Sequence, residues 1–202
     1  MVGDLLTRDD IIRGLRDLVA EAQATGATGR IHLVGGAALA LRYFERRTTS
    51  DVDASIAPES ELLEAARTVA ARNRWDPDWL NTNATMFVPF AKDPDWETLY
   101  EDERVVIRVA SAEALLAMKL NASRRGRDDD DIERLMAICS VLDIEAAEEL
   151  FEEYFPGEVI PDRGQRLLAD ILAAGEPEPA PIPPRPDLRP NAERGHQLGL
   201  GH

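Results

Sequence analysis

The stretch from Leu33 to Ala54, which reads LVGGAALALRYFERRTTSDVDA, limits the fold of this chain more than any other part of it. A short apolar run leads into Gly35-Gly36, a helix-like segment follows, and a second strand-like run carries Asp51 and Asp53. Side chains at i and i+2 of an extended segment share one face, so both carboxylates can reach one divalent cation. The glycines let backbone N–H groups approach a phosphate at a helix N-terminus. The stretch therefore predicts a strand–turn–helix–strand unit with a Mg²⁺ site beside a phosphate-binding turn.

Each half of this pattern also has an ordinary explanation. A glycine pair after a strand is common in tight strand–helix turns, and alternating polar residues are common on half-exposed strands. The order, the spacing and the intervening helix agree with one another, and this agreement favours the metal-site interpretation over a solvated strand face.

A second group of residues surrounds Lys119, which stands in the apolar run LLAMKL. Leu115, Leu116 and Leu120 are its neighbours at helical spacing, so this helix is predicted to be largely buried. A buried ammonium needs a partner, which would be a nucleotide phosphate or a catalytic carboxylate. The alternative is that the side chain extends along the helix to solvent.

Four aspartates follow, from Asp128 to Asp131. Acidic residues favour a helix N-terminus, which alone would explain the run. We predict Asp128 at or near the N-cap, and Asp131 one turn later, facing the preceding helix. Asp129 and Asp130 are interpreted as surface charges.

Bulk properties narrow the class of protein. The 202 residues suffice for one α/β domain or two small ones, and the net charge of −15 argues against broad nucleic-acid binding. No apolar run approaches the roughly 20 residues of a membrane-spanning helix, and the N-terminus lacks the apolar part of a signal peptide. We therefore expect a cytoplasmic protein without membrane contact. The single cysteine, Cys139, lies in an apolar run and is interpreted as a packed thiol.

The predicted fold class is α/β, a small mixed sheet flanked by helices, with a helical C-terminal region. We expect an α/β core over residues 1–110, helices that complete the site over 111–174, and a disordered proline-rich tail over 175–202, which holds seven of the 13 prolines. Strands are expected at 31–34, 51–56 and 104–109, with a further candidate at 86–89. Helices are expected at 8–24, 37–45, 58–73, 111–125, 128–142, 145–154 and 163–174.

Two other residue types are interpreted as structural. His32 lies on a predicted strand beside Leu33, where a histidine satisfied by its surroundings is expected rather than a general base. Four aromatic residues, Trp75, Trp79, Phe87 and Trp96, have the chemistry to stack a nucleobase, but core or lid positions are expected for them.

Taken together, the two motif groups resemble the AbiEii/MenT-like nucleotidyltransferases of the polymerase-β superfamily, which include toxins of type IV toxin–antitoxin systems. The resemblance covers roughly residues 30–142. It rests on Gly35-Gly36, on Arg47-x-Thr49-x-Asp51-x-Asp53, on the Lys119 helix and on Arg127-Asp128-x-x-Asp131-Ile132. The chain is short for this family, and the expected strand at 104–109 holds no third metal carboxylate.

The resemblance implies an enzyme that transfers a nucleoside monophosphate from an NTP to a tRNA 3′ end or a protein. Asp51 and Asp53 would hold Mg²⁺, and Lys119 would contact the nucleotide phosphates. Arg47, Thr49 and Ser50 would join Gly35 and Gly36 in nucleotide binding. Asp128 or Asp131 would orient Lys119 or assist the base. A cognate antitoxin is an implied partner.

Two alternatives stay open at this point. One is a catalytically weak module that binds nucleotide or a partner protein. The other is a small-molecule nucleotidyltransferase of the aminoglycoside type, which the acidic composition favours because such substrates are cationic.

Overall fold

A computed structural model describes residues 5–45, 48–123 and 128–190 of the chain. Over these residues the protein is a mixed α/β structure, as predicted, and its sheet has five strands. The strands are β1 (Gly29–Leu33), β2 (Val52–Ala57), β3 (Leu80–Asn81), β4 (Glu97–Glu101) and β5 (Val105–Val109). Their order across the sheet is β3-β2-β1-β5-β4.

The sheet is built around β1. It pairs antiparallel with β2, with Leu33 opposite Ala54, and parallel with β5, with Ile31 beside Ile107. β4 pairs antiparallel with β5, and β3 pairs parallel with β2. The pairing of β1 with β2 brings the glycine turn that follows β1 next to the start of β2.

Strict alternation along β2 separates its two faces. Val52, Ala54 and Ile56 are buried, whereas Asp53 and Ser55 between them are partly exposed. Each strand side chain points either into the core or to the opposite face of the sheet, where a site can form. The sequence pattern therefore fixes which face of β2 carries the aspartate.

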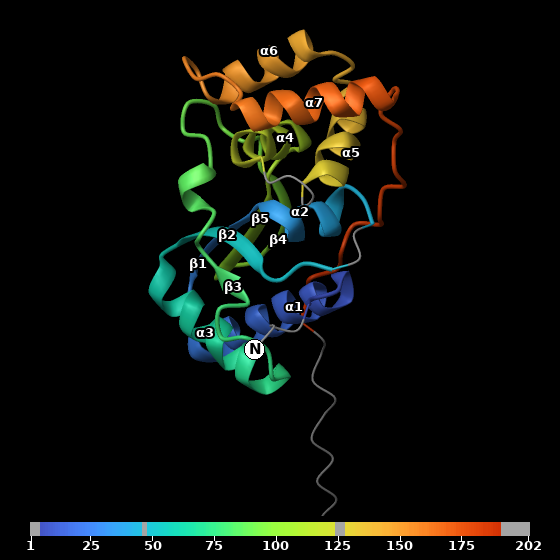
Figure 1. Ribbon diagram of the computed structural model, residues 1–202. Coiled ribbons are helices and arrows are strands. Elements are labelled where there is room, and N and C mark those ends of the chain that lie inside the picture. The colour runs from blue at the N-terminus through green and yellow to red at the C-terminus, as the bar shows by residue number, and fades with distance from the viewer. Residues whose placement is uncertain (1–4, 46–47, 124–127, 191–202) are drawn as a thin grey trace, which may run out of the picture.

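Two long helices lie on one side of the sheet, α1 (Arg8–Thr25) and α3 (Glu59–Asn73), at the bottom of Figure 1. Thr7 caps α1 with a capping box that also uses Asp10. Trp79 is buried with its Nε1–H donating to the carbonyl of Ala66 on α3 at 2.9 Å. This tryptophan is a core residue, and Trp75 packs against it with ring centroids 5.4 Å apart.

The C-terminal half gathers at the other end of the molecule (Figure 1). It consists of α4 (Ala112–Ala122), α5 (Asp129–Cys139), α6 (Ile144–Tyr154) and α7 (Asp162–Ala174). Ser111 caps α4 by accepting from the backbone N–H of Ala114 at 3.2 Å. α4 is apolar on all sides and is buried from Ala114 to Leu120, because α5, α6 and α7 all pack against it. The buried apolar residues form one cluster from Leu6 to Leu188.

The segment between α3 and β4 differs from the prediction. The predicted strand at 86–89 is wrong, since residues Thr85–Phe87 form one 3-10 turn, η1. The backbone N–H of Thr85 donates to the carbonyl of Thr82, and that of Phe87 to Ala84. These local bonds, together with Pro89, which has no N–H to donate to a ladder, favour a turn over a strand.

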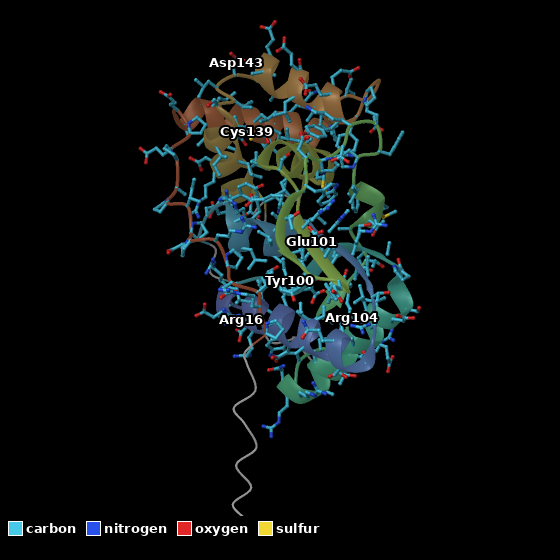
Figure 2. The ribbon with its side chains drawn as sticks, turned by 180° about the vertical axis from the view of Figure 1, so that it is seen from behind. Arg16, Tyr100, Glu101, Arg104, Cys139 and Asp143 are labelled. Carbon is cyan, nitrogen blue, oxygen red and sulfur yellow. The ribbon has the colours of Figure 1, made fainter. Side chains whose placement is uncertain are left out.

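Residues 175–190 differ from the disordered tail expected over 175–202, of which residues 191–202 lie outside the described residues. The 175–190 segment has no helix or strand, but it runs in extended form from α7 down to α1 (Figure 1). Pro183, Pro186 and Leu188 are buried there. Arg16 on α1, labelled in Figure 2, donates to the carbonyl of Asp187 at 2.6 Å. Prolines lose little conformational entropy on ordering, so a few such contacts suffice to hold the segment.

Among the described residues, no helix combines the length and the apolar character needed to cross a membrane.

Candidate functional site

A cavity of about 480 Å³ opens where β2, the start of α2 (Gly35–Arg42), η1 and α4 meet. This volume falls within the range of ~300–1,000 Å³ that is typical of small-molecule sites. Its lining is Gly35, Gly36, Thr49, Ser50, Asp51, Asp53, Asn83, Ala84, Phe87, Leu115, Met118, Lys119, Asn121 and Ala122. The fold thus brings the two motif groups of the sequence to one cavity, although about 65 residues separate them.

Asp51 and Asp53 line this cavity together, as their i, i+2 spacing requires of residues on one face. Asp53 lies on β2, and Asp51 precedes the first residue of that strand. Both side chains are half-buried. The Ser50 hydroxyl donates to Asp51 Oδ1 at 2.9 Å, which fixes one oxygen of this carboxylate.

The glycine turn is needed for the approach of α2 to β2. Gly35 has φ +64°, in the left-handed region, and an added Cβ would come within 2.9 Å of Asp53 Oδ2. Both the backbone conformation and the space therefore call for glycine at this position. Within the described part of the chain, no side chain caps the N-terminus of α2, whose first N–H groups also lack intrahelical partners. Such a helix start beside a cavity is suited to bind phosphate.

The remaining residues of the motif around Asp51 fall in different places. Thr49 lines the cavity and is held by two backbone hydrogen bonds with Leu6, of 2.7 and 2.9 Å. Arg47 lies outside the described residues, so its predicted part in nucleotide binding stays a prediction. Arg42, at the end of α2, is paired with Glu97 at 2.7 Å.

Asn81 is a site residue that the sequence did not reveal. It is 8% exposed and lies on β3 in register with Asp53. Its Nδ2 donates to Asp51 Oδ2 at 3.2 Å, and its Oδ1 accepts from the backbone N–H of Asn83 at 2.9 Å. Asp51 is thus held by Ser50 through one oxygen and by Asn81 through the other.

Lys119 is buried, as its apolar neighbours predicted, and its partners are carboxylates. Its Nζ lies 2.5 Å from Asp128 Oδ1 and 2.8 Å from Asp131 Oδ2. Asp128 is fully buried and Asp131 is 5% exposed. Asp128 occupies the N-cap position of α5, as predicted, but its side chain makes no capping bond and turns to Lys119 instead. Of these three residues, only Lys119 belongs to the cavity lining, and the two aspartates lie behind it.

His32 lies apart from the cavity lining and stacks on Trp96, with ring centroids 4.3 Å apart. Burial lowers the pKa of His32, and the charges of Arg108 and Arg30 lower it further. The stacking fits a structural role for His32, but its Nε2 is buried without a hydrogen-bond partner among the described residues, so the expectation of a satisfied histidine is wrong.

The donor set at the cavity fits Mg²⁺. This cation is usually bound through one or two carboxylates together with substrate phosphates, and Asp51 and Asp53 supply two carboxylates beside a helix N-terminus. Within residues 5–45, 48–123 and 128–190, no cluster of three or more His, Cys, Asp or Glu side chains is arranged to hold a metal alone. The site is therefore suited to a cation that arrives with a phosphate ligand, and less to a permanently bound structural metal.

The mixed sheet, the glycine turn that starts α2, and the two aspartates at the start of β2 form the arrangement that the resemblance to nucleotidyltransferases implies. The chain belongs to the family described as nucleotidyltransferase of unknown function (DUF6036), whose model matches residues 13–163. The match includes the glycine turn, the paired aspartates, Lys119 and the Asp128–Asp131 run. The family match supports membership of the nucleotidyltransferase superfamily. It does not show the narrower relationship to AbiEii/MenT-like proteins. No curated protein and no solved structure matches the sequence.

Proposed function

We propose that this protein is a Mg²⁺-dependent nucleotidyltransferase that transfers a nucleoside monophosphate from an NTP to an acceptor hydroxyl. The observation that carries the proposal is the meeting of Asp51, Asp53 and the N-terminus of α2 in one cavity. In the reaction, the acceptor oxygen bonds to the α-phosphorus, and the bond from that phosphorus to the pyrophosphate oxygen breaks. The acceptor hydroxyl releases its proton to solvent water, and pyrophosphate leaves.

Each part of the cavity has a role in this scheme. Asp51 and Asp53 hold the cation, which when bound neutralises phosphate charge and favours attack by the acceptor oxygen. The N–H groups at Gly35 and Gly36 bind the distal phosphates. Ser50 and Asn81 keep the Asp51 carboxylate in a fixed orientation. A pre-oriented site lowers the reorganisation needed at the moment of reaction.

Lys119 acts from within its ion-paired group. An ammonium has three N–H donors, and the bonds to Asp128 and Asp131 use two of them. The third is available for a phosphate oxygen, because Lys119 also lines the cavity. We assign the two aspartates the task of holding Nζ in place.

The class of acceptor is inferred from the charge of the protein rather than from the geometry of the cavity. A toxin-like enzyme that modifies a tRNA 3′ end or a protein is one candidate, with a cognate antitoxin as its partner. The net charge of −15 opposes the approach of a long polyanion and favours a protein or a small cationic acceptor of the aminoglycoside type. The charge thus supports the small-molecule alternative as the second candidate.

One assay tests the proposal and also distinguishes between the classes of acceptor. The protein is incubated with each α-³²P-labelled NTP and Mg²⁺, with total tRNA, a protein extract or a panel of aminoglycosides added separately. We expect label in one acceptor class, and loss of that label when EDTA removes the cation. Absence of transfer with every NTP and every acceptor would contradict the proposal.

A further inference from the structure

We propose that Phe87 forms a nucleobase-binding wall of the cavity, so that the substrate base stacks on its ring. This inference rests on the proposed function and adds to it a position for the base. Phe87 is a large apolar side chain, yet 39% of it is exposed, and it faces the same cavity as Asp51 and Asp53. An exposed aromatic ring in a cavity that also holds phosphate-binding groups suggests a flat ligand.

The composition of the cavity supports this placement. Its carboxylate and hydroxyl side chains come from β2 and the residues just before β2, next to the start of α2. Asn83 before η1, and Lys119 and Asn121 on α4, add further polar groups. The cavity's larger apolar side chains come from η1 and α4, with Phe87 on the first and Leu115 and Met118 on the second, and Ala84 lies just before η1. A nucleoside triphosphate is divided in the same way, into a charged triphosphate and a flat, largely apolar base. With its phosphates at Gly35 and Gly36, the apolar side of the cavity remains for the base.

Phe87 is also held in a defined place relative to the aspartates. The Thr85 hydroxyl donates to the carbonyl of Ala54, the residue after Asp53, at 3.4 Å. The backbone N–H of Phe87 donates to Ala84 at 2.9 Å. The start of the turn is tied to β3 by the bond from Asn83 N–H to Asn81 Oδ1. The ring is therefore attached to the two strands that carry the proposed metal and positioning residues.

The three tryptophans make their packing contacts outside the cavity lining. Trp79 is buried under α3, Trp75 packs on Trp79, and Trp96 stacks on His32. Phe90, three residues beyond Phe87, is 96% exposed and does not line the cavity. Among the aromatic residues of the described chain, Phe87 is the one that the cavity lining includes.

The test compares ligands with and without a base. Binding of ATP, UTP and inorganic tripolyphosphate, each with Mg²⁺, is measured by calorimetry for the wild type and for Phe87→Ala, Phe87→Trp and Phe90→Ala. Base–aromatic stacking is worth about 5- to 150-fold in affinity by alanine substitution. We expect Phe87→Ala to weaken both nucleotides within this range and to leave tripolyphosphate binding unchanged. Phe87→Trp should retain nucleotide binding, and Phe90→Ala should behave as the wild type.

Three results would overturn the inference, and they differ in what else they overturn. Equal nucleotide affinity of Phe87→Ala and the wild type would remove the base wall but leave the phosphate site standing. Equal weakening of nucleotide and tripolyphosphate would show that Phe87 supports the cavity without contacting a base. If the wild type binds neither NTP nor tripolyphosphate, the proposed function fails, and the inference fails with it. Melting curves of all variants establish that each is folded.

Discussion

The buried group formed by Lys119, Asp128 and Asp131 allows a prediction of how much stability the protein loses when Lys119 is replaced. The exposed fractions are 8% for Lys119, 0% for Asp128 and 5% for Asp131, so all three groups lie largely away from water. Replacing Lys119 by Met keeps most of the apolar stem and removes the ammonium. The buried carboxylates of Asp128 and Asp131 then lose their ion pairs with the lysine ammonium.

Removal of one partner from a buried ion pair costs about 3–5 kcal/mol, because the remaining charge is left in a poorly solvated place. For a chain of this size each kcal/mol lowers the melting temperature by about 2–4 °C. We therefore expect Lys119→Met to lower the melting temperature by about 6–20 °C. Urea unfolding, monitored by circular dichroism, gives the free energy of unfolding independently.

The chain supplies its own control, because Lys92 is its other lysine. Lys92 pairs with Glu153 at the surface, where the two side chains are 37% and 59% exposed. Surface pairs contribute about 0–1 kcal/mol, so Lys92→Met should change stability little. Adding Asp131→Asn to Lys119→Met should restore part of the loss, since it removes one of the two carboxylate charges. A Lys119→Met variant no less stable than Lys92→Met would refute the assignment of a buried ion-paired group.

Three further predictions concern other parts of the molecule. Leu188→Ala should lower the free energy of unfolding by about 2 kcal/mol if the 175–190 segment packs as described, whereas an unchanged melting temperature would show that it does not. Burial opposes ionisation of Asp102, but hydrogen bonds from Val105, Tyr100, Gln23 and Arg104 outweigh it and lower its pKa from 3.8 to about 2. Asp102 therefore contributes stability above its ordinary pKa that is lost as the pH falls toward about 2, and Asp102→Asn should flatten the acid limb of the stability curve. Burial raises the pKa of the Cys139 thiol to about 12, so iodoacetamide should alkylate the folded protein far more slowly than the urea-unfolded chain, and equal rates would contradict this.

The parts of the fold that the sequence predicted are those where periodicity and burial coincide. Alternation along β2 placed Asp53 opposite the core, and the apolar neighbours of Lys119 placed that helix in the interior. Thr7 and Ser111, which are of residue types favoured at helix N-caps, cap α1 and α4. In each case a local pattern and the tertiary environment favour the same structure.

The parts that the sequence did not predict depend on partners far along the chain. β3 has two residues, too few for any periodic signal, yet it places Asn81 beside Asp51. β4 reads ETLYE and was missed, because its strand character comes from pairing with β5. Composition alone suggested a disordered tail, but composition does not show that Arg16 meets the carbonyl of Asp187, 171 residues away.

The central claim is that Asp51 and Asp53 form the catalytic centre of a nucleotidyltransferase, and nucleotidyl transfer by the double variant Asp51→Asn/Asp53→Asn tests it most directly. Its matched control is Ser55→Ala, which alters the same face of β2 outside the cavity lining. With the acceptor that the wild type labels, and with melting curves confirming that both variants fold, we predict transfer at background level for the double variant and at wild-type level for Ser55→Ala. Undiminished Mg²⁺-dependent transfer by the folded double variant would contradict the account.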